Sequence, residues 1–200
     1  VTSLGGVPLY LDEWKIDLAY SCSQKGLSCP PGLGPFSMND RAENKMINRK
    51  DKVPNWYLDV SLLNKYWGSD RVYHHTAPVN MNFGIREALR LLAEEGLEVS
   101  WDRHKKNAKL LWDSLENIGL ELQVKEELRL PTLTTVKIPQ GVDGKAFTKH
   151  LLNNFGVEIG GGLGDLAGKV WRIGLMGYNS TSTNVDKIID IIKTELPKFR

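Results

Sequence analysis

Residues 17–25 read Asp-Leu-Ala-Tyr-Ser-Cys-Ser-Gln-Lys, and residues 30–32 follow as Pro-Pro-Gly. The apolar start of this stretch predicts a strand over residues 16–21, and a second strand is expected over residues 33–38. The serine, glycine and proline around Lys25 predict a loop with unusual backbone angles between the two strands. A lysine that forms a Schiff base must be fixed in such a loop, but a single lysine in a turn is ordinarily a solvated charge. The residues alone leave both interpretations of Lys25 open.

Regular elements are expected on both sides of Gly96, which should separate two long helices. The domain boundary is placed there, so that residues 1–96 end a larger α/β domain and residues 97–200 form a small α+β domain. Thr183 and Asp186 are expected to begin the last helix as a variant of the capping box. The expected elements are a helix capped by Asn39 or Asp40, helices over residues 82–95, 100–118, 143–154 and 183–196, and strands over residues 120–125, 132–138, 157–160 and 170–175.

Composition is that of an ordinary globular protein, with 41% hydrophobic and 25% charged residues among 200. The net charge of +2, from 26 basic and 24 acidic residues, indicates neither nucleic acid nor a membrane as a partner. The basic clusters at residues 49–52 and 103–106 are expected to be solvated helix faces. Cys22 and Cys29 are too few for a disulfide framework or a metal site, so both are expected to be reduced thiols.

The chain opens with Val1 rather than with methionine, and no apolar run is long enough to cross a bilayer. We therefore expect it to be a fragment of a longer protein. An α/β domain that lacks its upstream strands exposes sheet edge and core, so the isolated 200 residues are expected to be poorly soluble.

The stretch around Lys25 closely resembles the cofactor-lysine segment of the alanine–glyoxylate/serine–pyruvate aminotransferases, which are class-V, fold-type I enzymes that use pyridoxal 5′-phosphate (PLP). The resemblance covers essentially the whole chain and about half of a family member. It implies the C-terminal part of a mixed-sheet large domain, followed by a small α+β domain. The other motifs that carry it, in the family's order, are residues 1–10 (Val-Thr-Ser-Leu-Gly-Gly-Val-Pro-Leu-Tyr), 73–76 (Tyr-His-His-Thr), 130–132 (Leu-Pro-Thr), 161–164 (Gly-Gly-Leu-Gly) and 170–174 (Val-Trp-Arg-Ile-Gly).

This resemblance implies a role for several residues. Lys25 carries the cofactor as a Schiff base and moves the proton at the substrate α-carbon, and Gln24 contacts the cofactor phosphate. Val1 packs against the cofactor ring, directly after an aspartate that would lie one step before the first residue. Tyr73 and Thr76 reach the phosphate of the partner subunit, which implies a homodimer with shared active sites.

Two further motifs were weighed against simpler interpretations. The pattern around Arg172 alone favours an edge-strand arginine that faces solvent, whereas the resemblance implies that Arg172 binds the substrate carboxylate. The glycine-rich residues 160–164 do not fit a phosphate-binding P-loop, because Leu163 and Val170 stand where glycine and Ser or Thr are required. A closely packed or flexible turn is expected instead.

The adjacent histidines of the Tyr-His-His-Thr motif are not expected to bind a metal. His74 and His75 would point to opposite faces of an extended segment, and no carboxylate or cysteine lies at ligand spacing.

The implied function is transamination from alanine or serine to glyoxylate or pyruvate. Serine–glyoxylate and 3-hydroxykynurenine transaminases of the same family remain alternatives, and class-V desulfurases and kynureninases fit the motifs less well. An inactive truncated product that acts only as a dimerisation partner is the alternative of another class. An intracellular protein is expected, in the peroxisome or mitochondrion of a eukaryote or otherwise in the cytoplasm, although residues 198–200 are not a recognisable peroxisomal signal.

Overall fold

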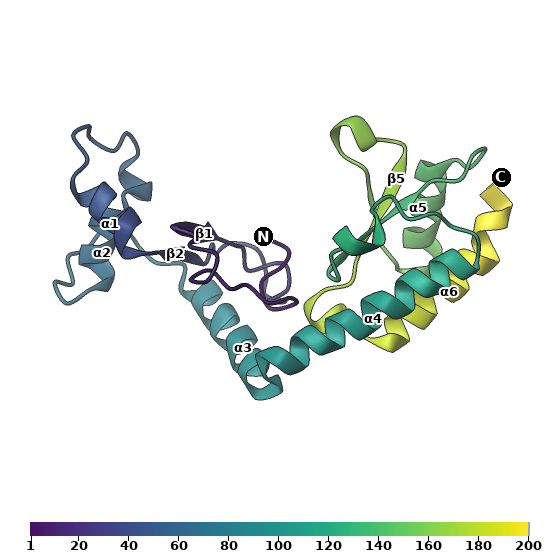
Figure 1. Cartoon of the computed structure of the whole chain (residues 1–200), viewed down its shortest axis with the longest axis horizontal. Coiled ribbons are helices and arrows are strands. Elements are labelled where there is room, and N and C mark those ends of the chain that lie inside the picture. Colours follow the sequence, from purple (N-terminus) through teal and green to yellow (C-terminus); the bar gives the residue numbers. More distant parts are fainter. Residues whose placement is uncertain (200) are drawn as a thin grey trace.

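The computed structural model describes residues 1–199. In Figure 1, α1 and α2 form a lobe at one end, the strands β1 and β2 lie near the N-terminus, and α4 to α6 surround a second sheet at the other end. The elements are β1 (Leu18–Tyr20), β2 (Phe36–Met38), α1 (Asp40–Ile47), α2 (Val60–Trp67), α3 (Val79–Glu95), α4 (Leu97–Asn117), β3 (Leu133–Lys137), α5 (Gly144–Phe155), β4 (Gly160–Gly161), β5 (Val170–Gly174) and α6 (Ser182–Glu195).

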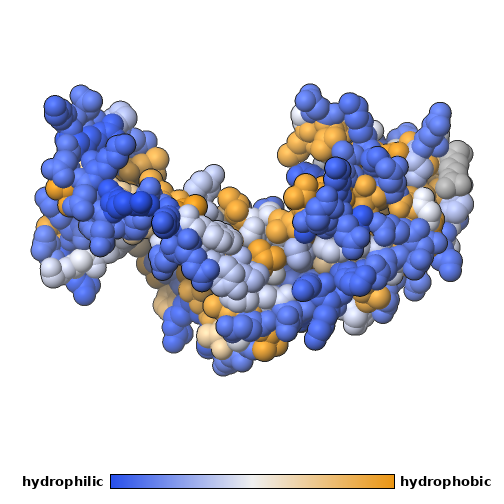
Figure 2. All heavy atoms as spheres, in the orientation of Figure 1, coloured by the Kyte–Doolittle hydropathy of each residue, from blue (hydrophilic) through white to orange (hydrophobic). Residues whose placement is uncertain are grey.

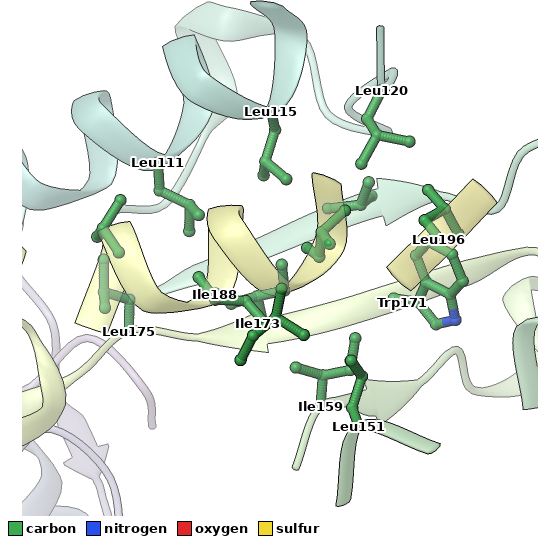
Figure 3. Packing of buried hydrophobic residues seen from close by; sticks show 14 of the residues in the cluster. Leu111, Leu115, Leu120, Leu151, Ile159, Trp171, Ile173, Leu175, Ile188 and Leu196 are labelled. Atoms are coloured by element: carbon green, nitrogen blue, oxygen red, sulfur yellow. The ribbon is translucent and has the colours of Figure 1, made fainter. Parts of the chain in front are cut away.

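The core of the C-terminal half is formed by one face of a three-stranded antiparallel sheet with the order β3-β5-β4. Apolar residues of α4 and α6 recur at helical spacing and pack against this face together with α5 (Figure 3). The main members of the buried cluster are Leu111, Leu115, Val136, Phe147, Leu151, Trp171, Ile173, Val185, Ile188 and Ile192.

Alternation along β5 determines where its arginine lies. Trp171 and Ile173 are buried in the cluster, so Arg172 between them belongs to the opposite face of the sheet. On that face Arg172 is paired with Thr135 of β3 and with Gly160 of β4. Because β5 is the central strand, Arg172 is not on an edge strand, which corrects the simpler of the two interpretations made from the sequence.

Gly96 separates α3 from α4, as expected. Its φ of +89° lies in the left-handed region that favours glycine, and Figure 1 shows the two helices meeting there at a sharp corner. The predicted cap at Asn39 is also confirmed, because its side chain accepts from the N–H of Ala42 at the start of α1. Gly156 ends α5 in the left-handed conformation.

The last helix begins differently from the expectation. Thr181, rather than Thr183, is the N-cap of α6, because its side-chain oxygen accepts from the N–H of Asn184. Thr183 already lies within the helix. The cap therefore stands two residues earlier than the Thr183 and Asp186 pair predicted.

Two predicted strands are much shorter than expected. Over residues 120–125 only Leu122 forms a β-bridge, to Val136, before the chain enters a 3₁₀ turn at Glu126–Leu128. Of residues 157–160 only Gly160 belongs to a strand, the two-residue β4. The 8-residue helix α2, capped by Asp59, was not predicted, and none of its residues is buried.

Within residues 1–199, no helix combines the length and apolar character needed to span a membrane.

Candidate active site

The loop that carries Lys25 is closed by hydrogen bonds to Ser23, a fully buried serine. The Ser23 hydroxyl donates to the carbonyl of Pro30 at 2.7 Å, and the Ser23 N–H donates to the carbonyl of Leu33 at 3.0 Å. The Ser23 carbonyl accepts from the N–H of Cys29 at 3.0 Å. These bonds join the end of β1 to the chain that leads into β2, so the loop is held at both ends.

Lys25 begins a tight turn within this loop. Its carbonyl accepts from the N–H of Ser28 at 2.9 Å, and Ser28 has a φ of +57°. The Lys25 side chain is half-buried, and among residues 1–199 its amine has no hydrogen-bond or ion-pair partner. Gln24, directly before it, is exposed. The amine and the amide are therefore both available to a ligand.

The N-terminal segment supports the other side of the loop. A β-carbon on Gly26 would lie 2.1 Å from the carbonyl oxygen of Leu4, so only glycine fits directly after Lys25. The carbonyl of Val1 accepts from the hydroxyl of Ser21 at 3.0 Å, and the Val1 residue is 51% exposed. Val1 and Lys25 thus belong to one packed unit.

A turn that follows β5 contacts the Lys25 loop from the C-terminal half of the chain. The turn spans Gly177–Asn179, and two successive backbone amides of it donate to side chains. The Gly177 N–H donates to Nε2 of His104 at 2.8 Å, and the Tyr178 N–H donates to the hydroxyl of Ser28 at 2.8 Å. The strand that carries Arg172 is therefore tied at its end to the loop that carries Lys25.

His104 is completely buried, which corrects the expectation of a solvated helix face at this position, although Lys105 and Lys106 of the same cluster are exposed as expected. Burial lowers the pKa of His104, so the neutral ring is favoured. A neutral ring with its proton on Nδ1 donates to the carbonyl of Ser100 at 2.7 Å and leaves Nε2 to accept from Gly177. The Ser100 hydroxyl in turn donates to the carbonyl of Gly5 at 2.7 Å.

Arg103 is also not a solvated side chain as expected, because it is half-buried and paired. Its guanidinium forms a bidentate pair with Glu95 across the Gly96 break, with Nε 2.5 Å and Nη2 2.8 Å from the two carboxylate oxygens. Its Nη1 donates to the carbonyls of Gly177 at 2.9 Å and Ser180 at 2.8 Å. Hydrogen bonding from Arg103 lowers the pKa of Glu95. Arg103 therefore braces the helix corner and the turn together.

Arg172 lies over the glycine-rich segment. Its Nε donates to the carbonyl of Gly161 at 2.6 Å, and a β-carbon on Gly160 would lie 3.2 Å from its Nη2. The side chain is only partly buried, and within the described chain no acidic group forms an ion pair with it. An arginine fork without an acidic partner is suited to bind a carboxylate ligand.

Tyr73 and Thr76 lie in the lobe formed by α1 and α2, which Figure 1 shows at the opposite end of the molecule from α4 to α6. Their hydroxyl oxygens are 3.0 Å apart, and the tyrosine is 70% exposed. The histidines between them are fixed within the lobe: His74 stacks on Trp56, and its Nδ1 is 2.9 Å from Nδ1 of His75. The hydroxyls thus lie on the surface of this lobe, and among residues 1–199 no hydrogen bond joins residues 73–76 to the Lys25 loop.

The structure therefore brings Val1, Gln24 and Lys25 into one unit and ties the strand of Arg172 to it. It leaves Tyr73 and Thr76 on the separate lobe, and Figure 2 shows the surface hollowed between this lobe and the C-terminal half. The residues that make these ties, Ser28, Arg103 and His104, were not predicted from the sequence. Across residues 1–199, no three side chains of the types that ligate metals gather in one place.

Comparison with known proteins places this arrangement in context. Residues 1–188 match the family described as aminotransferase class-V. The chain is 49% identical over 200 residues to alanine–glyoxylate aminotransferase of Callithrix jacchus, covering 98% of this chain and 48% of the relative. It is 37% identical over 203 residues to (S)-ureidoglycine–glyoxylate transaminase of Bacillus subtilis (strain 168), covering 92% and 49%.

Among solved structures, the crystal structure of alanine–glyoxylate aminotransferase from Nostoc sp. superposes with a TM-score of 0.94 at 63% identity, covering 96% of this chain and 51% of that one. The chain thus spans about half the length of the relatives it matches.

Proposed function

The chain belongs to the class-V aminotransferase family, with the fold-type I architecture of that family, and on this premise we propose that the full-length protein is a transaminase. It moves an amino group from alanine or serine to glyoxylate or pyruvate, with Lys25 as the residue that binds the cofactor. The observation that carries the proposal is the Lys25 loop, which is closed at Ser23 and presents an amine without a partner among the described residues. The substrates are inferred from relatives such as alanine–glyoxylate aminotransferase of Callithrix jacchus.

The family uses PLP, and the residues present fit that cofactor. Lys25 offers an amine for its aldehyde, while amide and hydroxyl groups at Gln24, Tyr73 and Thr76 suit a phosphate, which needs many hydrogen bonds. When bound, PLP supplies an electron-withdrawing ring that stabilises negative charge at the substrate α-carbon.

Lys25 has two tasks in this proposal. Its amine would hold the cofactor between turnovers and, when free, would act as the base that moves a proton between the substrate α-carbon and the cofactor. A turn held by the Ser28 N–H and by the close contact of Gly26 with Leu4 keeps the backbone that carries that amine in a fixed place.

Arg172 orients the substrate in this proposal. Its guanidinium pairs with the α-carboxylate through two parallel hydrogen bonds, which fixes the α-carbon relative to Lys25. The bond from Nε to the Gly161 carbonyl and the glycine at position 160 hold the fork against the sheet.

We further propose that two copies of the chain share each active site. Tyr73 and Thr76 present their hydroxyls from a lobe that, within the described residues, forms no hydrogen bond with the Lys25 loop of the same chain, so they are suited to reach the phosphate held by a partner. The lobe also exposes large apolar side chains, including Trp56 and Trp67, which a partner would cover.

We propose the same domain boundary as the sequence indicates, at Gly96 between α3 and α4.

Reductive trapping tests the proposed role of Lys25. The full-length protein is incubated with PLP, reduced with borohydride and digested, and the modified peptides are identified by mass spectrometry. We expect a selective pyridoxyl mass on Lys25 that Lys25→Ala abolishes and Lys106→Ala, a change at an exposed lysine of α4, leaves intact. Modification spread over surface lysines in the full-length protein would show that Lys25 is not the cofactor lysine.

A further inference from the structure

Ser28 joins the two parts of the proposed site through a single residue. Its N–H donates to the carbonyl of Lys25 at 2.9 Å, and its hydroxyl accepts from the N–H of Tyr178 at 2.8 Å. The turn that contains Tyr178 begins three residues after β5, the strand of Arg172. Two hydrogen bonds and a short length of chain therefore connect Lys25 with the strand of Arg172.

The turn at Gly177–Asn179 is closely packed against the Lys25 loop. Gly177 is buried, has a φ of +60°, and leaves no space for a β-carbon, which would lie 1.9 Å from the Ser28 hydroxyl oxygen and 2.9 Å from the Gly26 carbonyl oxygen. The turn thus lies directly on the residues that follow Lys25.

The other side of the turn is held by α4. His104 accepts from the N–H of Gly177, and Arg103 donates to the carbonyls of Gly177 and Ser180. These bonds fix the turn to the C-terminal half. The hydrogen bond to Ser28 and the close approach of Gly177 to the Gly26 carbonyl then connect the turn to the Lys25 loop, and of these two contacts only the hydrogen bond depends on the Ser28 side chain.

We propose that Ser28 is a positioning residue of the transaminase, which sets the place of the Arg172 strand relative to Lys25 through its hydrogen bond to Tyr178. This inference rests on the proposed function and adds to it a residue that touches neither substrate nor cofactor. It predicts that Ser28 affects the affinity of the site for the carboxylate of the amino donor. It also predicts that Ser28 does not affect the binding of the cofactor by Lys25.

The positive φ of Ser28 provides a matched set of variants. Ser28→Gly removes the hydroxyl and is at ease at a φ of +57°, so no loss of stability is expected. Ser28→Asn keeps a side-chain acceptor, and asparagine tolerates this conformation better than other residues with a β-carbon. Any defect of Ser28→Gly that Ser28→Asn restores therefore belongs to the hydrogen bond.

Three measurements on the full-length protein test the proposal: borohydride trapping at Lys25, steady-state kinetics with the amino donor, and amide hydrogen exchange of the apoprotein. For Ser28→Gly we expect unchanged trapping, a KM for the amino donor raised about three- to tenfold with kcat within about twofold, and faster exchange in residues 176–180. Ser28→Asn should restore both the KM and the exchange rate towards the wild-type values.

The outcomes separate the two proposals. If the wild-type protein is not trapped at Lys25, the proposed function fails, while the exchange measurement still tests the Ser28 bond without cofactor. If Ser28→Gly matches the wild type in KM and exchange, Ser28 does not position the strand. If Ser28→Gly lowers the melting temperature and the trapping together, and Ser28→Asn does not restore them, the role of Ser28 is only structural and the inference is overturned.

Discussion

A β-carbon on Gly177 would lie 1.9 Å from the hydroxyl oxygen of Ser28, although about three-quarters of the chain separates the two residues in the sequence. The Lys25 loop and the turn after β5 therefore meet with no space between them.

Gly177→Ala should be more damaging than an alanine at another glycine of the same backbone conformation. Gly168 has a φ of +73° with nothing within 4 Å of its β-position, so Gly168→Ala carries only conformational strain, about 1–2 kcal/mol. Gly177→Ala adds overpacking against Ser28, about 1–3 kcal/mol more. Urea unfolding of the two variants measures the difference, and equal losses of stability would show that the loop moves aside freely.

The stability of the fold should decline as the pH falls through the range in which histidine titrates. The unfolded chain protonates His104 near the usual value of 6.5, but burial lowers the pKa of the folded residue. The unfolded state thus binds more protons between the folded pKa and 6.5, so the free energy of unfolding falls with pH in that window. Arg103 opposes the proton on His104 and Glu95 favours it, and both face this residue.

Comparison with a variant that does not titrate isolates this effect. His104→Gln is compared with the wild type by urea unfolding from about pH 8 to about pH 5, across the window in which the folded and unfolded forms of His104 bind different numbers of protons. The stability advantage of the wild type should shrink as the pH falls below the usual pKa of histidine. A constant advantage across the range would mean that His104 titrates alike in both states.

Arg103→Lys should destabilise the protein, whereas Arg90→Lys should not. Arg103 is only 30% exposed at its side chain and bridges Glu95 with two backbone carbonyls, a pattern that a lysine amine cannot reproduce. A loss of about 1–3 kcal/mol is expected. Arg90 pairs with Glu87 and Glu94 on the exposed surface of α3, where such pairs contribute little. Thermal unfolding of both variants checks the contrast, which equal melting temperatures would contradict.

Arg172→Gln should weaken substrate binding without affecting the cofactor lysine. Loss of a charge-assisted pair with the carboxylate predicts a KM for the amino donor raised about 10- to 100-fold, with trapping at Lys25 retained. Lys169→Gln removes one positive charge from an exposed position nearby and serves as the control. A similar rise in KM for both variants would show that Arg172 acts only through the overall charge of this region and does not bind the carboxylate directly.

Mixed subunits test whether the sites are shared. Subunits with Lys25→Ala are co-expressed with subunits in which Tyr73→Phe and Thr76→Val are combined, so that each mixed dimer has one site without any defect. We expect activity to recover in this mixture. A mixture of Lys25→Ala with Arg172→Gln subunits should not recover, because these residues act in the same chain. Absence of recovery in the first mixture, with mixed dimers demonstrated by native mass spectrometry, would contradict the shared site.

Local signals in the sequence predicted much of the fold. Gly96, the Asn39 cap and the apolar spacing of α4 and α6 lie within a few residues of the structures they specify. The helix α2 was missed although Val60, Leu63 and Trp67 recur at helical spacing, because the stretch is only 8 residues long and its apolar face packs against no buried core. The segment at residues 120–125 alternates like a strand, but it meets β3 through only one bridge.

The candidate site was predicted less completely than the fold. Motifs pointed to Lys25 and Arg172, but nothing local marks Ser28, whose partner Tyr178 is 150 positions away. His104 did carry a signal that was overlooked. It lies four residues before Ala108, on the face that continues through Leu111 and Leu115, and all of these are buried. The charged residues on either side of His104 favoured a solvated face, although His104 itself belongs to the interior.

The corner at Gly96 gives α4 the mechanics of a lever. The helix has 21 residues, so its far end lies about 30 Å from the corner, and a tilt of about 10° there would displace that end by about 5 Å. His104, two turns along, would move by only about 2 Å. The bonds from α4 to the turn are therefore placed near the fulcrum, where an angular change produces the least displacement. A tilt of α4 about this corner would therefore displace the far end of the helix much more than the turn that contacts the Lys25 loop.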